Sequence, residues 1–177
     1  RQASLLAKAE AAERVAGALG VAADRIRDEG LRTLERSASR ALASTTNKPE
    51  LFAGIRFEPR TLRYSVVDHD GRPVPPDPST GERTVLALAL VTGLQRASGL
   101  RFPLIMEAVF KPLGPLHQDN VVRLLLIQRQ EQTLLLLKPG ELPPTLQHLI
   151  DARIGQRFAV RRPHPKRNVS ELVEVTA

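Results

Sequence analysis

The chain has 177 residues, of which 42% are hydrophobic, so it is long enough to bury a core and too apolar to be mostly disordered. It contains no Cys, which excludes disulfide frameworks and thiolate metal sites, and an aromatic content of only 3% disfavours stacking platforms for single-stranded nucleic acid. The net charge of +7 suits DNA, RNA or nucleotide phosphates as partners, although a merely soluble basic protein has the same charge balance.

No apolar run approaches the roughly 18 residues that a membrane-spanning helix needs, and no signal-peptide pattern is present. We therefore expect a cytoplasmic protein with no membrane partner. The first residue is Arg1 rather than Met, from which we expect a fragment of a longer chain.

Residues 1–46 are expected to form a helical arm, because Ala, Leu, Arg and Glu dominate and apolar residues recur at a helical period. A break is expected near Gly17–Gly20, and Asn47-Lys48-Pro49 is expected to end the arm. The pattern fits the end of a coiled coil that runs into a globular head. On these residues alone, an ordinary helical hairpin is the simpler interpretation.

From residue 47 to residue 177 the pattern predicts an α/β lobe with a parallel central sheet. The predicted strands lie at 52–57, 61–67, 102–106, 133–137, 156–160 and 171–176, and the predicted helices at 82–97, 116–127 and 142–150. The strands at 102–106 and 133–137 are continuously apolar, which is typical of central strands covered on both faces. The helix at 82–97 is expected to be buried on every side, because Val85–Val91 is apolar throughout.

The segment Pro78-Ser79-Thr80-Gly81-Glu82-Arg83 precedes and starts this helix. Seen alone, Ser79 and Glu82 have the spacing of a capping box, in which each side chain satisfies a backbone N–H of the first turn. The same segment suits an anion: Gly81 lets the backbone approach a phosphate, Ser79 offers a hydroxyl, and the helix start presents free N–H groups.

The order of these features resembles the C-terminal lobe of the ABC-type ATPase heads of SMC-like proteins, where a signature loop L-S-x-G-[EQ] precedes the Walker B strand. The resemblance covers about residues 50–176 and is greatest to the ATPases of DNA phosphorothioation (sulfur modification) systems. The matching segments, in the same order, are Asp68-His69-Asp70-Gly71, Ser79-Thr80-Gly81-Glu82-Arg83, Ser98-Gly99 and Phe102-Pro103-Leu104-Ile105-Met106. The resemblance implies a P-loop NTPase-like fold preceded by the end of a coiled-coil arm.

The resemblance also implies ATP and Mg²⁺ as cofactors and a homodimer of heads as the working unit. Nucleotide held by the partner head would be contacted in trans by Ser79, Thr80, Gly81 and Glu82. Glu107 stands at the Walker B position and is expected to be the catalytic residue, reaching Mg²⁺ through water. Lys138 falls at the switch position, where its charge could neutralise phosphate.

Several positions depart from the family's pattern. The Walker B Asp is replaced by Glu107, the catalytic Glu by Ala108, the D-loop Asp by Gly114 and the switch His by Lys138. The P-loop G-x-x-x-x-G-K-[ST] is absent from the sequence. ATP hydrolysis is therefore expected only in combination with an N-terminal P-loop lobe, from the same chain or another.

The C-terminal region is rich in basic residues, and Asp151 is its only acidic neighbour in this reading. The candidate DNA contacts are Arg153, Arg157, Arg161, Arg162, Lys166 and Arg167. Such a cluster is either a solvated surface or a sequence-independent contact with DNA phosphates. The four His residues, at 69, 117, 148 and 164, lack metal-ligand spacing and are not expected to bind metal.

The favoured hypothesis is an SMC-like head lobe that dimerises on ATP and acts on DNA, in DNA sulfur modification, repair or defence. The departures at the catalytic positions support an alternative, a degenerate, non-hydrolysing head that serves as a DNA-binding or dimerisation module. A third interpretation is an unrelated α/β binding domain in which Ser79 and Glu82 only cap a helix.

Overall fold

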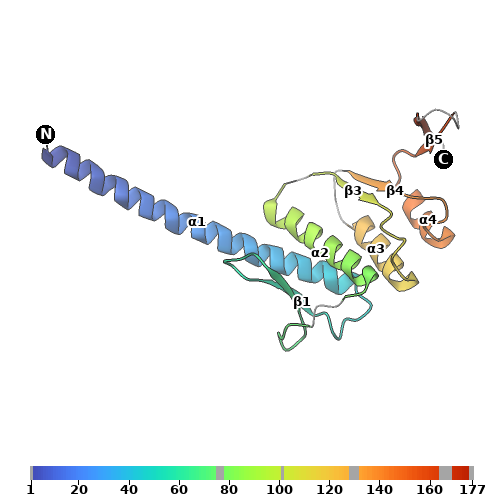
Figure 1. The fold of residues 1–177 in the computed structure, drawn as a ribbon, viewed down its shortest axis with the longest axis horizontal. Helices are drawn as coiled ribbons and strands as arrows, with labels where there is room; N and C mark the ends of the chain where they lie inside the picture. Colours follow the sequence, from blue (N-terminus) through green and yellow to red (C-terminus); the bar gives the residue numbers. More distant parts are fainter. Residues whose placement is uncertain (1, 75–77, 101, 128–131, 164–168, 176–177) are drawn as a thin grey trace.

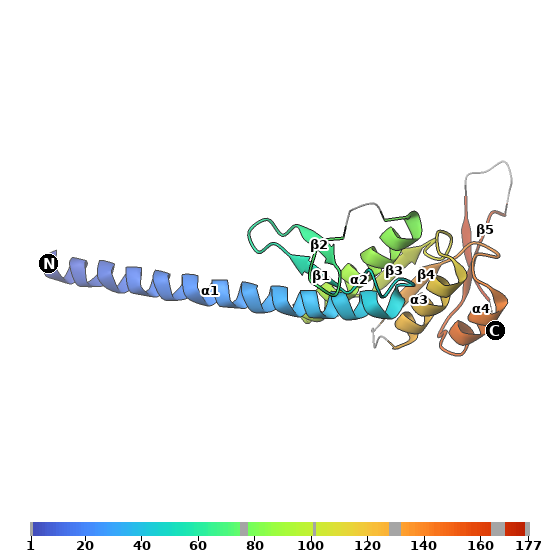
Figure 2. The ribbon, with the colours of Figure 1, turned by 90° about the horizontal axis from the view of Figure 1, so that it is seen from below.

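A single helix, α1 (Gln2–Thr45), runs out of a small lobe and extends far beyond it (Figure 1 and Figure 2). The computed structural model describes residues 2–74, 78–100, 102–127, 132–163 and 169–175. The predicted break near Gly17–Gly20 is wrong, because α1 is continuous through both glycines. A helix-interior glycine costs only about 1 kcal/mol, which the surrounding Ala, Val and Leu residues outweigh.

The other elements follow α1 in the predicted order, with bounds that differ from the predicted ones by a few residues. They are β1 (Gly54–Phe57), β2 (Tyr64–Val67), α2 (Thr80–Ser98), β3 (Leu104–Glu107), α3 (Pro115–Ile127), β4 (Thr133–Leu136), α4 (Pro144–Asp151), β5 (Phe158–Arg161) and β6 (Glu171–Glu174). Within the described ranges these strands form antiparallel pairs β1–β2 and β5–β6 and one parallel pair, β3–β4. The predicted parallel pairing of the two apolar strands is confirmed, but the sheet that they form has only two strands.

The parallel sheet is covered on one face only, so the predicted burial on both faces is wrong. Leu104 and Met106 of β3 are 8% and 7% exposed and face the core, whereas Ile105 between them is 62% exposed. On β4, Leu134 and Leu136 are also exposed. Because successive side chains of a strand point to opposite faces, these apolar residues mark an open face of the sheet.

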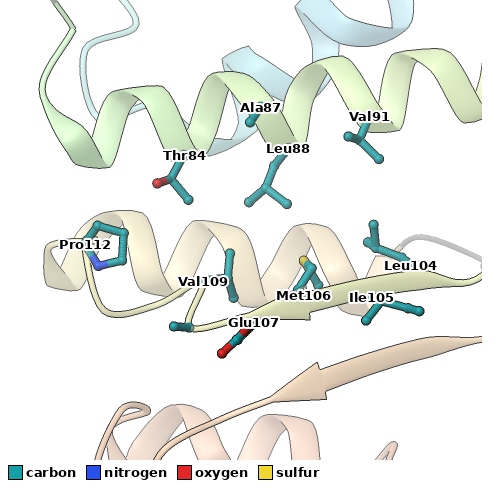
Figure 3. Close-up of a pocket in the computed structure, with 11 residues that line it drawn as sticks. Thr84, Ala87, Leu88, Val91, Leu104, Ile105, Met106, Glu107, Val109 and Pro112 are labelled. Atoms are coloured by element: carbon teal, nitrogen blue, oxygen red, sulfur yellow. The ribbon is translucent and has the colours of Figure 1, made fainter.

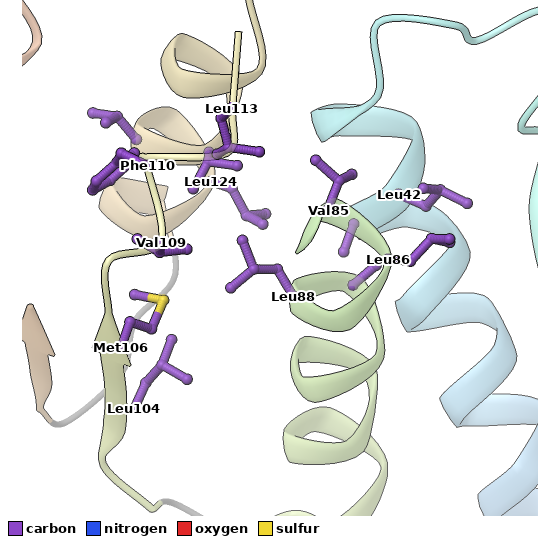
Figure 4. Packing of buried hydrophobic residues seen from close by; sticks show 14 of the residues in the cluster. Leu42, Val85, Leu86, Leu88, Leu104, Met106, Val109, Phe110, Leu113 and Leu124 are labelled. Carbon is purple, nitrogen blue, oxygen red and sulfur yellow. The ribbon is translucent and has the colours of Figure 1, made fainter. Parts of the chain in front are cut away.

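The core lies where α1, α2, α3 and β3 meet (Figure 4). Leu42, Val85, Phe110, Val121 and Val122 are fully buried there. Each such side chain contributes about 1.5–3 kcal/mol relative to an exposed position. The lobe is therefore built around the last turns of α1, whose outer part is exposed throughout residues 8–29.

Helix α2 packs against α1 but does not lie wholly inside the core. Leu94 is 53% exposed and Ala87 is also exposed, so the predicted burial on every side is wrong. Gly93 is buried, and a Cβ built on it would stand 2.8 Å from the Cβ of Ala38. The two helices thus approach each other as closely as a glycine allows. Among the described residues, no helix is both long and apolar enough to cross a membrane.

We expect Gly93→Ala to lower the free energy of unfolding by about 1–3 kcal/mol, because the added methyl group overpacks the α1–α2 contact. Gly17→Ala is the matched control, since nothing lies within 4 Å of a Cβ at that position. It should raise the free energy of unfolding by about 1 kcal/mol, through helix propensity alone. Urea unfolding followed by circular dichroism measures both, and equal effects of the two substitutions would contradict the close packing.

Candidate functional site

The predicted capping box is present at the start of α2. The Ser79 side chain accepts a hydrogen bond from the Glu82 backbone N–H (N···O 3.3 Å). In return, the Ser79 backbone N–H donates to Oε2 of Glu82 over 2.7 Å. Ser79 and Thr80 are exposed, whereas Gly81 and Glu82 are buried. The loop therefore presents its first two residues to solvent and holds the next two against the lobe.

Glu82 is tied to the segment that follows α1. Its Oε1 lies 2.6 Å from Nζ of Lys48, while its side chain is only 8% exposed. The hydrogen bond from Lys48 lowers the pKa of Glu82 below its ordinary value of 4.5, against the opposing effect of burial, and the bonds from Ser79 add to the lowering. The carboxylate is thus ionised and has a partner on each oxygen, so it faces inward and not toward a ligand in solvent.

Gly81 allows a close approach by the loop that follows β3. A Cβ on Gly81 would stand 2.9 Å from the carbonyl oxygen of Pro112 and 3.8 Å from Nδ1 of His117. Any larger residue would push this loop away from the start of α2. The glycine is therefore required by a packing contact, in addition to any role in approaching a phosphate.

His117, in the first turn of α3, is a buried residue that the sequence did not single out. Its side chain lies in the core region at 7% exposure, and its Nε2 accepts a hydrogen bond from the Asn47 backbone N–H (3.3 Å). Burial lowers the pKa of His117 below 6.5; Glu82 opposes this change and Lys48 adds to it. One turn further along α3, Asn120 donates to the carbonyl oxygen of Thr45 over 3.4 Å. Both α3 residues thus bind the end of α1.

Glu107 ends β3 as predicted, with its side chain exposed. Ala108, at the position of the catalytic Glu, has a positive φ of 49° and donates its N–H to the Leu136 carbonyl over 3.1 Å. In the described part of the chain, no group of three or more His, Cys, Asp or Glu side chains could hold a metal ion. Mg²⁺ usually binds through one or two carboxylates plus phosphate oxygens and water, so Glu107 fits as one ligand among several and not as a complete site.

A second acidic residue, Glu141, holds the loops that follow β3 and β4 together. Its two carboxylate oxygens accept the backbone N–H groups of Phe110 (3.1 Å) and Lys138 (3.0 Å). Lys138 is exposed just after the C-terminal end of β4, and its role at the switch position stays a prediction. Local sequence gave no signal for Glu141, because the two amides that it binds lie on different loops.

A cleft of about 260 Å³ lies between α2 and β3 (Figure 3). Its lining is largely apolar, with Leu88 and Val91 of α2 on one side and Leu104 and Met106 of β3 on the other. Ser79, Thr80 and Gly81 are not among its lining residues. The cleft is therefore separate from the Ser79–Gly81 loop, and the polar side chains in its lining are those of Thr84 and Glu107.

The candidate DNA-binding cluster is less uniformly basic than the sequence suggested. Arg153, Arg161 and Arg162 are exposed, but Arg157 forms an ion pair with Asp151. The pairing of β5 with β6 also places Glu171 opposite Arg161, which a reading along the chain could not reveal. The remaining two candidates, Lys166 and Arg167, lie outside the described residues.

No protein-family model matches the sequence, and no curated protein matches it significantly. Among solved structures, 43 chains are similar to this one, and they include the following two. One is described by the words "ATP-driven dimerization and DNA stimulated activation of SMC ATPases"; it has 16% sequence identity and a TM-score of 0.55, and the match covers 82% of this chain and 85% of that one.

The other solved structure is the SMC head domain from Thermotoga maritima, with 18% identity and a TM-score of 0.50. The match covers 87% of this chain but only 51% of that one, so this chain spans about half the length of the Thermotoga head. At such identities the similarity shows the fold. The prediction of an SMC-head-like fold is confirmed, and the narrower resemblance to sulfur-modification ATPases is not.

The shifted pKa values of His117 and Glu82 predict how the free energy of unfolding depends on pH. The unfolded chain takes up a proton on His117 near pH 6.5, whereas the folded chain does so only at lower pH. The stability that this difference provides is complete above that value and is lost as the pH falls through the folded pKa. Glu82 acts in the same direction at more acidic pH, below 4.5.

We therefore expect the free energy of unfolding to fall as the pH drops below about 6.5, and His117→Gln to reduce that dependence, because glutamine keeps an acceptor but does not titrate. Chemical denaturation at a series of pH values measures the slope. His148→Gln, at an exposed position on α4, controls for the loss of a histidine. An unchanged slope in His117→Gln would show that this histidine is not the titrating group.

Proposed function

We propose that this chain is the signature-bearing, C-terminal lobe of an SMC-type ATPase head, which clasps ATP held by a P-loop lobe and thereby joins two heads. One observation carries the proposal. A capped helix that begins at Ser79 leads directly into the parallel strand that ends at Glu107, within a fold similar to SMC heads. This is the order that a signature loop and a Walker B strand require.

The geometry of the loop supports contact with a phosphate. Ser79 and Thr80 are exposed at the N-terminus of a 19-residue helix, where the backbone N–H groups and the helix dipole favour an anion. Gly81 lets the loop lie close against Pro112 and His117 of the lobe. The γ-phosphate of ATP on a facing head is the proposed ligand, with Mg²⁺ reached by Glu107.

The open face of the β3–β4 sheet supports the partnership with a P-loop lobe. Parallel sheets are normally covered on both faces, and two strands alone are marginally stable. Here the open face of the sheet carries three exposed apolar side chains, those of Ile105, Leu134 and Leu136. The half of the Thermotoga head that this chain does not span is large enough to supply the missing cover. That lobe belongs either to the same chain or to another one.

The residues at the catalytic positions support a second candidate function, in which the head binds ATP but hydrolyses little of it. Ala108 has no group that could orient a water molecule, and Gly114 and Lys138 replace two further polar residues expected in such heads. A head of this kind would bind ATP and dimerise with little hydrolysis. The two candidates therefore share ATP-driven association and differ in the rate of phosphate release.

We extend the proposal to DNA as the partner of the assembled heads, in DNA sulfur modification, repair or defence. The support is the net charge of +7 and the exposed Arg153, Arg161 and Arg162 near the C-terminus. The similar SMC ATPase is itself described as DNA-stimulated. The acidic residues on β6 weaken the positive electrostatic potential of this cluster. We therefore expect its binding to DNA to be weak, salt-sensitive and independent of sequence.

Ser79→Arg tests the clasp. The bulky cation fills the space in front of the loop, and we expect ATP- and Mg²⁺-dependent dimerisation of the assembled head, measured by light scattering, to be abolished. Ser79→Asn is the matched control, because asparagine also caps a helix and should cost little stability. Dimers that form equally in all three proteins, or in none of them, would contradict the proposal.

Replacing Arg153 and Arg161 with glutamine tests the contact with DNA. If each side chain meets one phosphate, the double variant should bind duplex DNA more weakly and lower the slope of log K against log salt by about 2. Fluorescence anisotropy at several salt concentrations measures this slope. Arg123→Gln on α3, whose guanidinium is already paired with Asp119, should leave it unchanged. An unaltered slope in the double variant would exclude the cluster as the DNA contact.

A further inference from the structure

Three contacts join the C-terminal end of α1 to the elements around the Ser79–Gly81 loop. Lys48 binds Glu82 of α2, the Asn47 backbone binds His117 of α3, and the Thr45 carbonyl binds Asn120 of α3. All three partners on the α1 side lie within four consecutive residues, at the point where the long helix stops. The start of α2 and the start of α3 therefore share one anchor.

We propose that Lys48 and His117 are positioning residues that set the geometry of the Ser79–Gly81 loop from the end of α1. The proposal rests on the proposed function in one respect, namely that this loop is the part that clasps nucleotide. It also gives Glu82 a different role from the predicted nucleotide contact. Glu82 acts within the lobe, as the link between Lys48 and the loop.

Lys48 acts on Ser79 through the two carboxylate oxygens of Glu82. Oε2 of Glu82 fixes the Ser79 N–H at 2.7 Å, and Oε1 is held by the Lys48 ammonium at 2.6 Å. Because the carboxylate is rigid and planar, moving the ammonium moves the atom that orients Ser79. Glu82 is almost fully buried, so loss of Lys48 would leave a charge with little access to water. The exposed loop is thus held by a buried group whose charge is balanced from α1.

His117 acts on the other side of the loop. Its Nε2 accepts from the backbone where α1 ends, and its Nδ1 lies 3.8 Å from the place where a Gly81 side chain would begin. The Pro112 carbonyl closes the same side at 2.9 Å. The His117 ring and the Pro112 carbonyl therefore border Gly81 on the side toward α3, and the ring is held by Asn47. Displacement of the end of α1 would reach the loop along both routes.

The test uses amide signals of Ser79 and Gly81 in ¹H–¹⁵N spectra of the whole protein. We expect Lys48→Met to displace both signals and to raise the pH at which the Ser79 signal titrates, because the Glu82 carboxylate loses its cation. Lys48→Arg should restore both properties. Lys111→Met, which removes an exposed lysine from the loop after β3, should leave the signals in place. In a Glu82→Gln background, Lys48→Met should add no further displacement.

His117 is tested with a pair of substitutions. His117→Gln removes the ring but keeps an acceptor for Asn47, so it should displace the Gly81 and Asn47 signals less than His117→Ala does. His117→Ala removes the acceptor and the ring, and should displace both signals. If His117→Gln and His117→Ala displace them equally, the hydrogen bond to Asn47 does not position the loop.

The functional consequence is measured in the assembled head. We expect Lys48→Met to weaken ATP-driven association roughly tenfold, as loss of a charged hydrogen bond implies, and Lys48→Arg to restore it. The proposal is overturned if Ser79 and Gly81 signals of Lys48→Met match those of Lys111→Met, or if the loop moves while association stays at its original strength. If the unmodified protein does not associate with ATP, the proposed function fails, and the amide signals still decide whether Lys48 and His117 position the loop.

Discussion

Gly93 of α2 and Ala38 of α1 touch so closely that one added carbon atom would have to displace a helix. This contact lets the last turns of α1 enter the core, where Ala38, Ala41 and Leu42 are buried among residues of α2 and α3. The packing fixes the place where α1 ends, and with it the backbone that binds His117 and Asn120. The start of α2 therefore takes its position from a helix whose other end extends far beyond the lobe.

The parts of the fold that were predictable depend on local chemistry. Ser79 and Glu82 are three residues apart, and the hydrogen bonds of a capping box need no distant partner, so sequence alone located the start of α2 correctly. The left-handed Gly99 ends the same helix for an equally local reason. The strands β3 and β4 were located by their apolar runs. Their exposure was mispredicted, because a run of apolar residues indicates cover on both faces without showing which chain segment provides it.

The parts of the candidate site that were missed depend on contacts between distant residues. Lys48 and Glu82 are 34 positions apart, and Asn47 and His117 are 70 positions apart. A sequence motif contains only positions that are close along the chain, so it revealed neither the Lys48 partner of Glu82 nor the contact that His117 makes. The acidic residues on β6 were missed for the same reason, since only strand pairing brings Glu171 opposite Arg161. Local patterns located the loop, and tertiary contacts determine which side chains are free to act there.

The length of α1 has a mechanical consequence. The part of α1 that extends beyond the lobe, from Gln2 to about Gly30, spans about 40 Å at a rise of 1.5 Å per residue. Gln2 lies 36 residues, or about 54 Å, from Ala38, so a tilt of about 10° at the contact between Ala38 and Gly93 would move the far end of α1 by about 9 Å. Sub-ångström changes at the base are therefore amplified along the arm, and a load on the far end acts on the lobe with the corresponding leverage.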